Sequence, residues 1–167
     1  MKIKTLLITL VVSIFLLSGC PYESPVPLSS PEKSQIDARF IGKWRLPEEE
    51  KKEKGIVEIL NFNDHELLIL FKEENSEKID KARAFITEVK GVSYLNYQDV
   101  DLKPEKNPWL FLKYRFSGNR LYLNTVEEDL FAHKIQSSRK LRAFFKKNQH
   151  KKDFLDMEND LTLARAD

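Results

Sequence analysis

Short runs of apolar or alternating residues, separated by turn-forming residues, fill most of the chain after residue 36. Runs with a period of two are typical of strands, and turn residues between them indicate antiparallel hairpins. We expect strands at 40–46, 56–62, 67–72, 82–89, 93–98, 109–116, 121–126 and 161–165. The pattern predicts a mainly β fold, an antiparallel meander that closes into a barrel or a strongly curved sheet.

The pair Gly118-Asn119 predicts the clearest hairpin, because both residue types tolerate the positive φ of a two-residue turn. With Ser117 opposite Arg120, the alternation of side chains determines every other pair. The apolar face then pairs Phe116 with Leu121, Tyr114 with Leu123 and Leu112 with Thr125. The other face pairs Arg115 with Tyr122 and Lys113 with Asn124, and it is mostly polar, as expected of a half-solvated sheet.

A second hairpin is predicted to turn at Asn63 and Asp64. Its arms, 56–60 and 67–71, are apolar on both faces. Such strands need cover on both sides, so we expect a barrel interior on one side and a helix on the other.

One helix is predicted before the last strand. Ser137 or Ser138 can cap its start, and Leu141, Phe144 and Phe145 follow at helical spacing. The segment 139–152 contains seven Lys or Arg residues and no acidic residue. Two interpretations stay open: a solvated helix face docked on the sheet, or a surface that faces anionic headgroups.

The first twenty residues predict export from the cytoplasm. Lys2 and Lys4 precede the run 6–17, which is apolar except for Thr9 and Ser13. A transmembrane helix needs about 20 apolar residues, so this shorter run indicates a cleaved signal peptide over 1–19.

The signal peptide ends in Leu17, Ser18, Gly19 and Cys20, which resembles the lipobox of bacterial lipoproteins. The resemblance implies cleavage before Cys20, a diacylglyceryl group on its thiol and acylation of the freed amine. Several acyl chains anchor a protein to a membrane almost permanently. Cys20 is the only cysteine, so its lipidation leaves no thiol for a disulfide or a metal.

Residues 20–35 are rich in proline and lack periodicity, which predicts an extended tether between the lipid and the domain. A single β-rich globular domain is then expected over 36–167. Within its first strand, Gly42 and Trp44 resemble the Gly-x-Trp start of lipocalins and lipocalin-like barrels. The resemblance implies a barrel with a Trp at one end and a small apolar or amphipathic ligand inside.

No catalytic constellation emerges from the sequence, and we expect no enzyme activity, no cofactor and no metal site. The three histidines, His65, His133 and His150, lack the close spacing of metal ligands. Ligand-binding candidates are the cations and aromatic residues of the middle strands. They are Arg83, Tyr97, Trp109, Arg115 and Tyr122, and outward pointing is expected of both arginines.

Two classes of function remain open. The first is a lipid-anchored module that binds a small apolar ligand, and the second is a protein-interaction or structural subunit of a cell-envelope complex. The 28 basic residues nearly balance the 26 acidic ones, which argues against a nucleic-acid binder. Because Pro21 rather than Asp follows Cys20, the expected location in a Gram-negative cell is the outer membrane, facing the periplasm.

Overall fold

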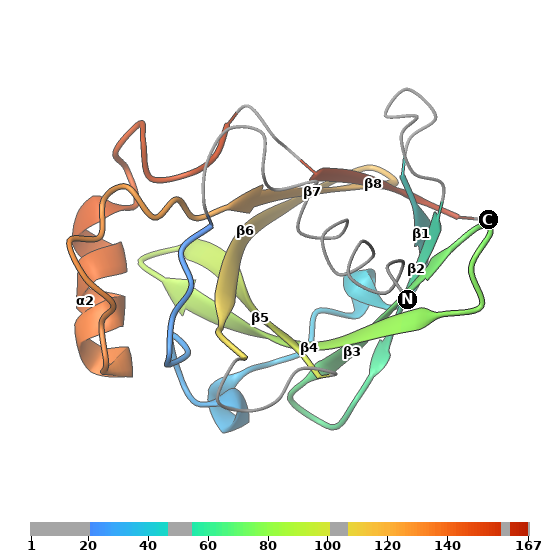
Figure 1. Cartoon of the computed structure of the whole chain (residues 1–167), viewed down its shortest axis with the longest axis horizontal. Helices are drawn as coiled ribbons and strands as arrows, with labels where there is room; N and C mark the ends of the chain where they lie inside the picture. Colours follow the sequence, from blue (N-terminus) through green and yellow to red (C-terminus); the bar gives the residue numbers. More distant parts are fainter. Residues whose placement is uncertain (1–20, 47–54, 101–106, 158–160, 167) are drawn as a thin grey trace, which may run out of the picture.

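The computed structural model describes residues 21–46, 55–100, 107–157 and 161–166. The predicted signal peptide and the lipobox with Cys20 lie outside these residues. Within the described part, eight antiparallel strands form a closed barrel in sequence order (Figure 1). The strands are β1 (Gly42–Arg45), β2 (Gly55–Asn61), β3 (Leu67–Glu73), β4 (Ile79–Val89), β5 (Val92–Asp99), β6 (Leu110–Ser117), β7 (Arg120–Thr125) and β8 (Leu161–Arg165). The predicted fold, a barrel with one helix before the last strand, is confirmed.

The hairpin β6–β7 has the register expected from its turn. Ser117 faces Arg120, Phe116 faces Leu121, and the remaining pairs follow to Leu112 and Thr125. Gly118 has a φ of 55°, a conformation that L side chains rarely adopt. The second hairpin, β2–β3, is also present, with Asn61 opposite Leu67.

The barrel interior is filled by one of two hydrophobic clusters. Each of the eight strands contributes to it, so in a closed barrel it must lie inside. Its buried members are Phe40, Trp44, Ile59, Leu67, Ala84, Leu95, Leu112, Leu121, Leu123 and Leu163. Every second residue along each strand therefore lines the interior, and the residues between them face outward.

A second cluster lies on the outside of the barrel. It joins the outer faces of β4, β5 and β6 to the helix α2 (Ser138–Asn148) and to the N-terminal segment. Its buried members are Tyr22, Leu28, Phe85, Val89, Tyr94, Trp109, Phe111, Val126, Phe131, Leu141, Phe145 and Phe154. The fold thus has two cores, separated by the wall of the barrel.

The helix α2 begins where the sequence predicts, with Ser137 as its N-cap. Leu141 and Phe145 are buried in the outer cluster, and Phe144 packs against it. The helix covers the β4–β6 side rather than the β2–β3 hairpin, which lies across the barrel from it (Figure 1). The expectation that a helix covers that hairpin is therefore wrong. None of the helices in the described part is both long and apolar enough to span a bilayer.

The N-terminal segment does not behave as the expected tether. Two isolated bridges pair Pro21 with Glu127 and Ser24 with Trp109. Tyr22 donates its backbone N–H to the carbonyl oxygen of Val126 at 2.9 Å, and Ser24 and Trp109 exchange backbone hydrogen bonds of 2.9 and 2.8 Å. The segment is extended, but it lies along the barrel because the apolar outer face of β4–β6 needs cover. The folded unit therefore includes the described residues from Pro21 onward and not only those after residue 36.

The first strand starts two residues later than predicted. Residues Ala38–Phe40 form a short 3₁₀ helix, η2, whose N-cap Asp37 accepts a hydrogen bond from the backbone N–H of Arg39. This helix places the Phe40 ring inside the barrel at the point where β1 begins. The Gly-x-Trp strand thus starts directly at Gly42.

Candidate functional site

Aromatic side chains close one end of the barrel, here called the Phe40 end. Trp44 donates its indole N–H to the carbonyl oxygen of Phe40 at 2.8 Å. The Phe40 ring packs edge-on against the half-buried rings of Tyr114 and Phe116, each with a centroid distance of 4.8 Å. These contacts hold η2 against the barrel and bury Phe40 and Trp44 at this end, with relative exposures of 0% and 2%.

Gly42 and Trp44 share a cationic partner on the last strand. The Arg165 guanidinium lies 4.9 Å from the centroid of the Trp44 ring, and its Nη1 donates to the carbonyl oxygen of Arg39 at 3.1 Å. A Cβ at Gly42 would lie 3.0 Å from Arg165 Nη2. The two residues of the Gly-x-Trp pattern therefore have one physical role, which is to seat this arginine over the closed end.

The opposite end, here called the Gly55 end after the start of β2, is less tightly filled. On β2, β3, β5 and β8, the inward-facing side chains nearer the Phe40 end are buried, and those nearer the Gly55 end are only half-buried. The buried set is Ile59, Leu67, Leu95 and Leu163. The half-buried set is Val57, Ile69, Phe71, Tyr97 and Leu161. On these four strands the interior thus presents half-buried apolar surface at the Gly55 end, whereas Ile86, Tyr114 and Phe116 are half-buried toward the Phe40 end.

Tyr97 is the candidate residue that faces the interior. It pairs with Ala84 across β4 and packs against the inner cluster. Burial raises the pKa of its hydroxyl, and the nearby Asp99 and Asp80 carboxylates raise it further. The neutral hydroxyl is thus a polar group beside the half-buried apolar side chains of this end, with Asp80 and Asp99 near it.

Arg83 and Trp109 meet on the outer side of the wall. The Arg83 guanidinium lies 4.9 Å from the centroid of the Trp109 ring, and its Nε and Nη2 donate to Gln98 Oε1 at 3.0 and 2.7 Å. Its Nη1 is 3.6 Å from Glu66 Oε1, which is an ion-pair distance but too long for a hydrogen bond. Glu66 is 7% exposed, so its carboxylate is largely withdrawn from water, whereas the Arg83 side chain is 35% exposed.

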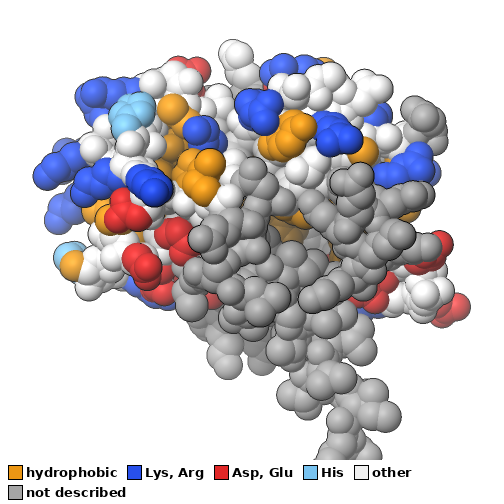
Figure 2. Space-filling model, turned by 90° about the horizontal axis from the view of Figure 1, so that it is seen from above, with side chains coloured by type: hydrophobic (Ala, Val, Ile, Leu, Met, Phe, Trp, Pro, Cys, Tyr) orange, Lys and Arg blue, Asp and Glu red, His pale blue; other side chains and the backbone are white. Residues whose placement is uncertain are grey.

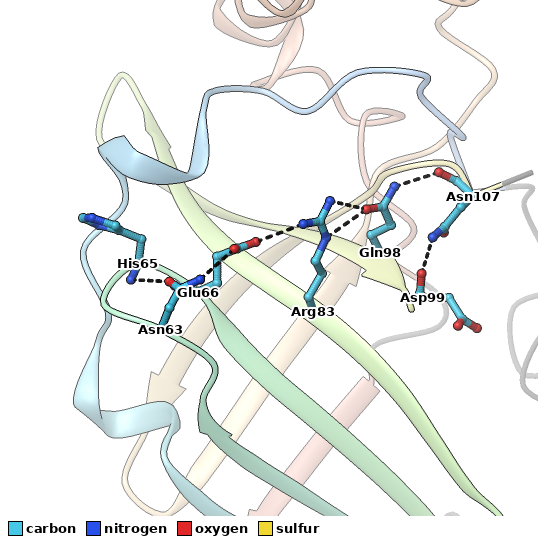
Figure 3. Close-up of polar contacts among 7 residues, drawn as sticks. All are labelled: Asn63, His65, Glu66, Arg83, Gln98, Asp99 and Asn107. Atoms are coloured by element: carbon cyan, nitrogen blue, oxygen red, sulfur yellow. Dashed lines mark hydrogen bonds and ion pairs between the residues drawn. The ribbon is translucent and has the colours of Figure 1, made fainter. Parts of the chain in front are cut away.

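Arg83 and Gln98 are the middle of a longer chain of polar contacts, drawn in Figure 3. At one end, Asn63 donates its side-chain N–H to Glu66 Oε2 at 3.0 Å. At the other end, Gln98 donates to the carbonyl oxygen of Asn107 at 2.8 Å. The chain ties the β2–β3 turn to the start of β6, so its chemistry is that of a structural clamp. Arg83 and the second candidate arginine, Arg115, both point outward, as expected from the sequence.

Arg115 and Tyr122 form a separate pair on the outer face of β6 and β7. The Arg115 guanidinium lies 4.1 Å from the centroid of the Tyr122 ring. The five candidate residues therefore occupy three places: Tyr97 inside, Arg83 with Trp109 outside, and Arg115 with Tyr122 on another outer face. The structure does not bring the five candidates into one site, and their role in ligand binding stays a prediction.

A buried amide that the sequence analysis did not identify holds the N-terminal segment. Asn96 accepts a hydrogen bond from the backbone N–H of Leu28 at 2.8 Å and donates to Thr87 Oγ1 at 2.9 Å. Ser29 Oγ lies 2.6 Å from the same Thr87 hydroxyl. The sequence signal that could have identified Asn96 is a polar residue between Leu95 and Tyr97 on an apolar strand.

A perturbed carboxyl lies beside Pro21. Burial raises the pKa of Glu127 to about 7, and the nearby carboxylates of Asp156 and Asp129 contribute to the shift. Its backbone N–H donates to the carbonyl oxygen of Phe154 at 3.2 Å. Sequence alone could not reveal this group, because Glu127 and Glu128 are an ordinary acidic pair in a chain rich in acids.

Among the described residues, no group of three or more His, Cys, Asp or Glu side chains could hold a metal ion. His65 contacts a distant segment, since its Nδ1 lies 3.0 Å from the carbonyl oxygen of Ser34. No protein-family model, curated protein or solved structure matches the chain. The functional conclusion therefore rests on the sequence and on the geometry of the barrel.

Proposed function

We propose that this protein is a lipid-anchored lipoprotein of the bacterial cell envelope that binds a small apolar or amphipathic ligand in its barrel. The observation that carries the ligand-binding part is the set of half-buried apolar side chains that face the interior near the Gly55 end. Phe40 and Trp44 are buried at the opposite end. Accessible apolar surface inside a closed barrel is a typical ligand-binding arrangement.

The chemistry of the lining favours a ligand with a long apolar part and a polar group. Val57, Ile69 and Leu161 offer hydrocarbon surface, and Phe71 adds an aromatic ring. Tyr97 supplies a neutral hydroxyl that can donate or accept one hydrogen bond. Burial of the apolar part would provide most of the binding free energy, and the hydroxyl would orient the polar group.

Titration with a fluorescent apolar probe, 1-anilinonaphthalene-8-sulfonate, tests the ligand site. Ile69→Trp fills the inner side of β3, and we expect it to weaken probe binding by at least about tenfold, the factor that 1.4 kcal/mol represents. Leu68→Trp is the matched control, since Leu68 is also half-buried but faces outward next to it. Equal effects of the two variants would contradict an interior site, and native mass spectrometry of the purified protein would identify any ligand that is retained.

The anchor rests on the resemblance of Leu17-Ser18-Gly19-Cys20 to a lipobox. Intact-mass analysis of the protein extracted from membranes tests it. We expect a mature chain that begins at Cys20 and carries the mass of the acyl groups. A chain that begins elsewhere, without acyl mass, would contradict the proposal, and fractionation of a Gram-negative host would test the expected outer-membrane location.

A second candidate function, a protein-interaction subunit, is favoured by one outer face. Ile56 on β2 and Ile79 on β4 are 42% and 43% exposed, and Leu60 is 36% exposed. The register places these side chains outward and sets Lys72 between Ile56 and Ile79. Exposed apolar residues interspersed with cations fit an envelope protein whose apolar contact surface has an acidic border.

Site-specific photo-crosslinking in cells distinguishes this second candidate. A crosslinker at Leu60 should capture one protein partner, whereas a crosslinker at Tyr122, on another outer face, should not. Identical products from both positions would contradict a specific contact at the β2–β4 face.

A further inference from the structure

Pro21, the residue after Cys20, lies against the folded domain rather than in a spacer. Pro21 pairs with Glu127, and the Tyr22 backbone N–H is bonded to Val126 at 2.9 Å. Cys20 directly precedes Pro21, and consecutive Cα atoms are about 3.8 Å apart. If Cys20 carries the lipid, as proposed above, the acyl chains leave from the surface of the domain itself. A domain held so closely has a restricted orientation on its membrane.

The elements around Pro21 belong to one layer that includes α2. The Tyr22 ring stacks on Phe131 with a centroid distance of 3.5 Å, and its hydroxyl accepts the backbone N–H of Ile135 at 3.0 Å. Phe131 in turn packs against Phe144 of the helix, with a centroid distance of 4.3 Å. The N-terminal segment and α2 therefore lie on the same side of the barrel (Figure 1).

The outward surface of α2 and of the turn after it is strongly basic. Leu141 and Phe145 turn inward, which leaves the cations of the helix and of the following turn in solvent. The exposed cations are Arg139, Lys140, Arg142, Lys146, Lys147, Lys151 and Lys152. Figure 2 shows Lys and Arg side chains gathered at the end of the molecule where α2 lies. An attractive surface for anions results, because the segment has no acidic residue.

The acidic groups of this layer lie beside Pro21 rather than on α2: Glu127 pairs with Pro21, and the Asp129 and Asp156 carboxylates lie near it. Glu23 pairs with Lys134 at 3.3 Å, outside the basic set. Arg142 donates to the backbone carbonyl oxygen of Glu88 at 2.7 Å rather than to its carboxylate. Asp153 follows Lys152 in the sequence and is the nearest acid along the chain.

We propose that the layer formed by the N-terminal segment and α2 rests on the membrane that holds the anchor, with its basic side chains against anionic lipid headgroups. Basic residues close to a lipid anchor are attracted to anionic membrane surfaces, and the two contacts reinforce each other. The β2–β3 face lies across the barrel from α2 (Figure 1), so it points away from the bilayer. This inference rests on the lipid anchor of the proposed function and adds an orientation to it.

Single-site fluorescence quenching of the lipidated protein tests the orientation. Cys20 is the only cysteine, so once it is acylated an introduced cysteine takes the label alone. An environment-sensitive nitrobenzoxadiazole label is placed at Lys147→Cys or, as the matched control across the barrel, at Lys72→Cys. Both residues are exposed lysines. The protein is reconstituted in phosphatidylcholine vesicles with or without phosphatidylglycerol, and some lipids carry a headgroup nitroxide as quencher.

We expect quenching at position 147 to exceed that at position 72 several-fold in the vesicles that contain phosphatidylglycerol. Triple charge reversal, Lys146→Glu, Lys151→Glu and Lys152→Glu, should abolish the excess without changing the thermal melt. Equal quenching at the two positions, or an excess that survives charge reversal, would overturn the orientation. Labelling of the protein that has no introduced cysteine would instead reveal a free Cys20 thiol and overturn the anchor itself.

A second measurement does not depend on acylation. The mature chain, from position 20 onward and with Cys20→Ser, is sedimented with phosphatidylglycerol vesicles and with phosphatidylcholine vesicles. We expect binding only to the anionic vesicles, and a loss on the order of tenfold or more with the triple charge reversal. Equal binding to the two kinds of vesicle, or equal binding with and without the charge reversal, would contradict the headgroup contact.

Discussion

Replacement of Tyr22 by Ala should greatly destabilise the protein, although a residue two positions after Cys20 would have no such effect if it belonged to a tether. The Tyr22 side chain is 1% exposed. Its ring stacks on Phe131 at 3.5 Å and lies 6.3 Å from the Phe111 ring. Its hydroxyl accepts a hydrogen bond from the Ile135 N–H at 3.0 Å.

The magnitude follows from these contacts. Truncation of a buried aromatic ring to Ala costs about 3–5 kcal/mol, which combines the lost transfer free energy and the cavity. The Ile135 N–H would also lose its partner, a loss of about 1 kcal/mol that part of this range already covers. With an unfolding entropy of about 2.1 cal/mol/K per residue, a folded unit of this size should melt roughly 10–16 °C lower.

Thermal and urea unfolding of the mature protein, followed by circular dichroism, measure the effect. Tyr22→Phe keeps the stacking and loses only the hydrogen bond, so we expect a cost of about 1 kcal/mol. Glu23→Ala alters the neighbouring side chain, which is 54% exposed in its ion pair with Lys134, and should cost almost nothing. A Tyr22→Ala protein that melts within about two degrees of the wild type would refute the packing of this segment on the barrel.

Three further outcomes are expected. Because burial raises the pKa of Glu127 to about 7 from an ordinary 4.5, the folded state retains a proton that the unfolded state has already released. The free energy of unfolding should therefore fall as pH rises from about 4.5 to 7, and urea titrations of Glu127→Gln should show this slope reduced. Gly118→Ala should cost about 1 kcal/mol, since φ is 55° there, whereas Gly118→Asn should cost less; equal melting temperatures for all three proteins would argue against a strained turn. Arg83→Met should destabilise by about 1–3 kcal/mol because it leaves the Glu66 carboxylate buried, and the double variant with Glu66→Gln should recover part of the loss; strictly additive effects would show that the pair is not coupled.

The local features of the fold could be predicted because each depends on a few neighbouring residues. The β6–β7 register follows from the turn at Gly118-Asn119 and from a period of two. The observed pairs, from Ser117–Arg120 to Leu112–Thr125, are the predicted ones. The start of α2 after Ser137 follows from a capping residue and helical spacing. In both cases the physics acts over one turn or one cross-strand pair.

The candidate site was less predictable because its contacts join distant segments. Arg83 and Trp109 were identified as residues of interest, but their meeting with Glu66 on the outer wall depends on the register of three strands. Tyr97 was predicted as a ligand-binding candidate together with them. Its position in the alternation of β5 side chains places it on the inner side of the wall. The raised pKa of Glu127 depends on burial, which has no local pattern.

The sequence by itself determined the strands, the sharp hairpin turn, the helix and the sides on which apolar residues lie, because backbone sterics and side-chain alternation act locally. Only the tertiary structure decided that β1 closes on β8 through Trp44 and Arg165. It also decided that the proline-rich segment after Pro21 is part of the outer core instead of a spacer. Both outcomes depend on which apolar surfaces remain uncovered once the sheet has curled, and that balance of burial is a property of the assembled barrel rather than of any one segment.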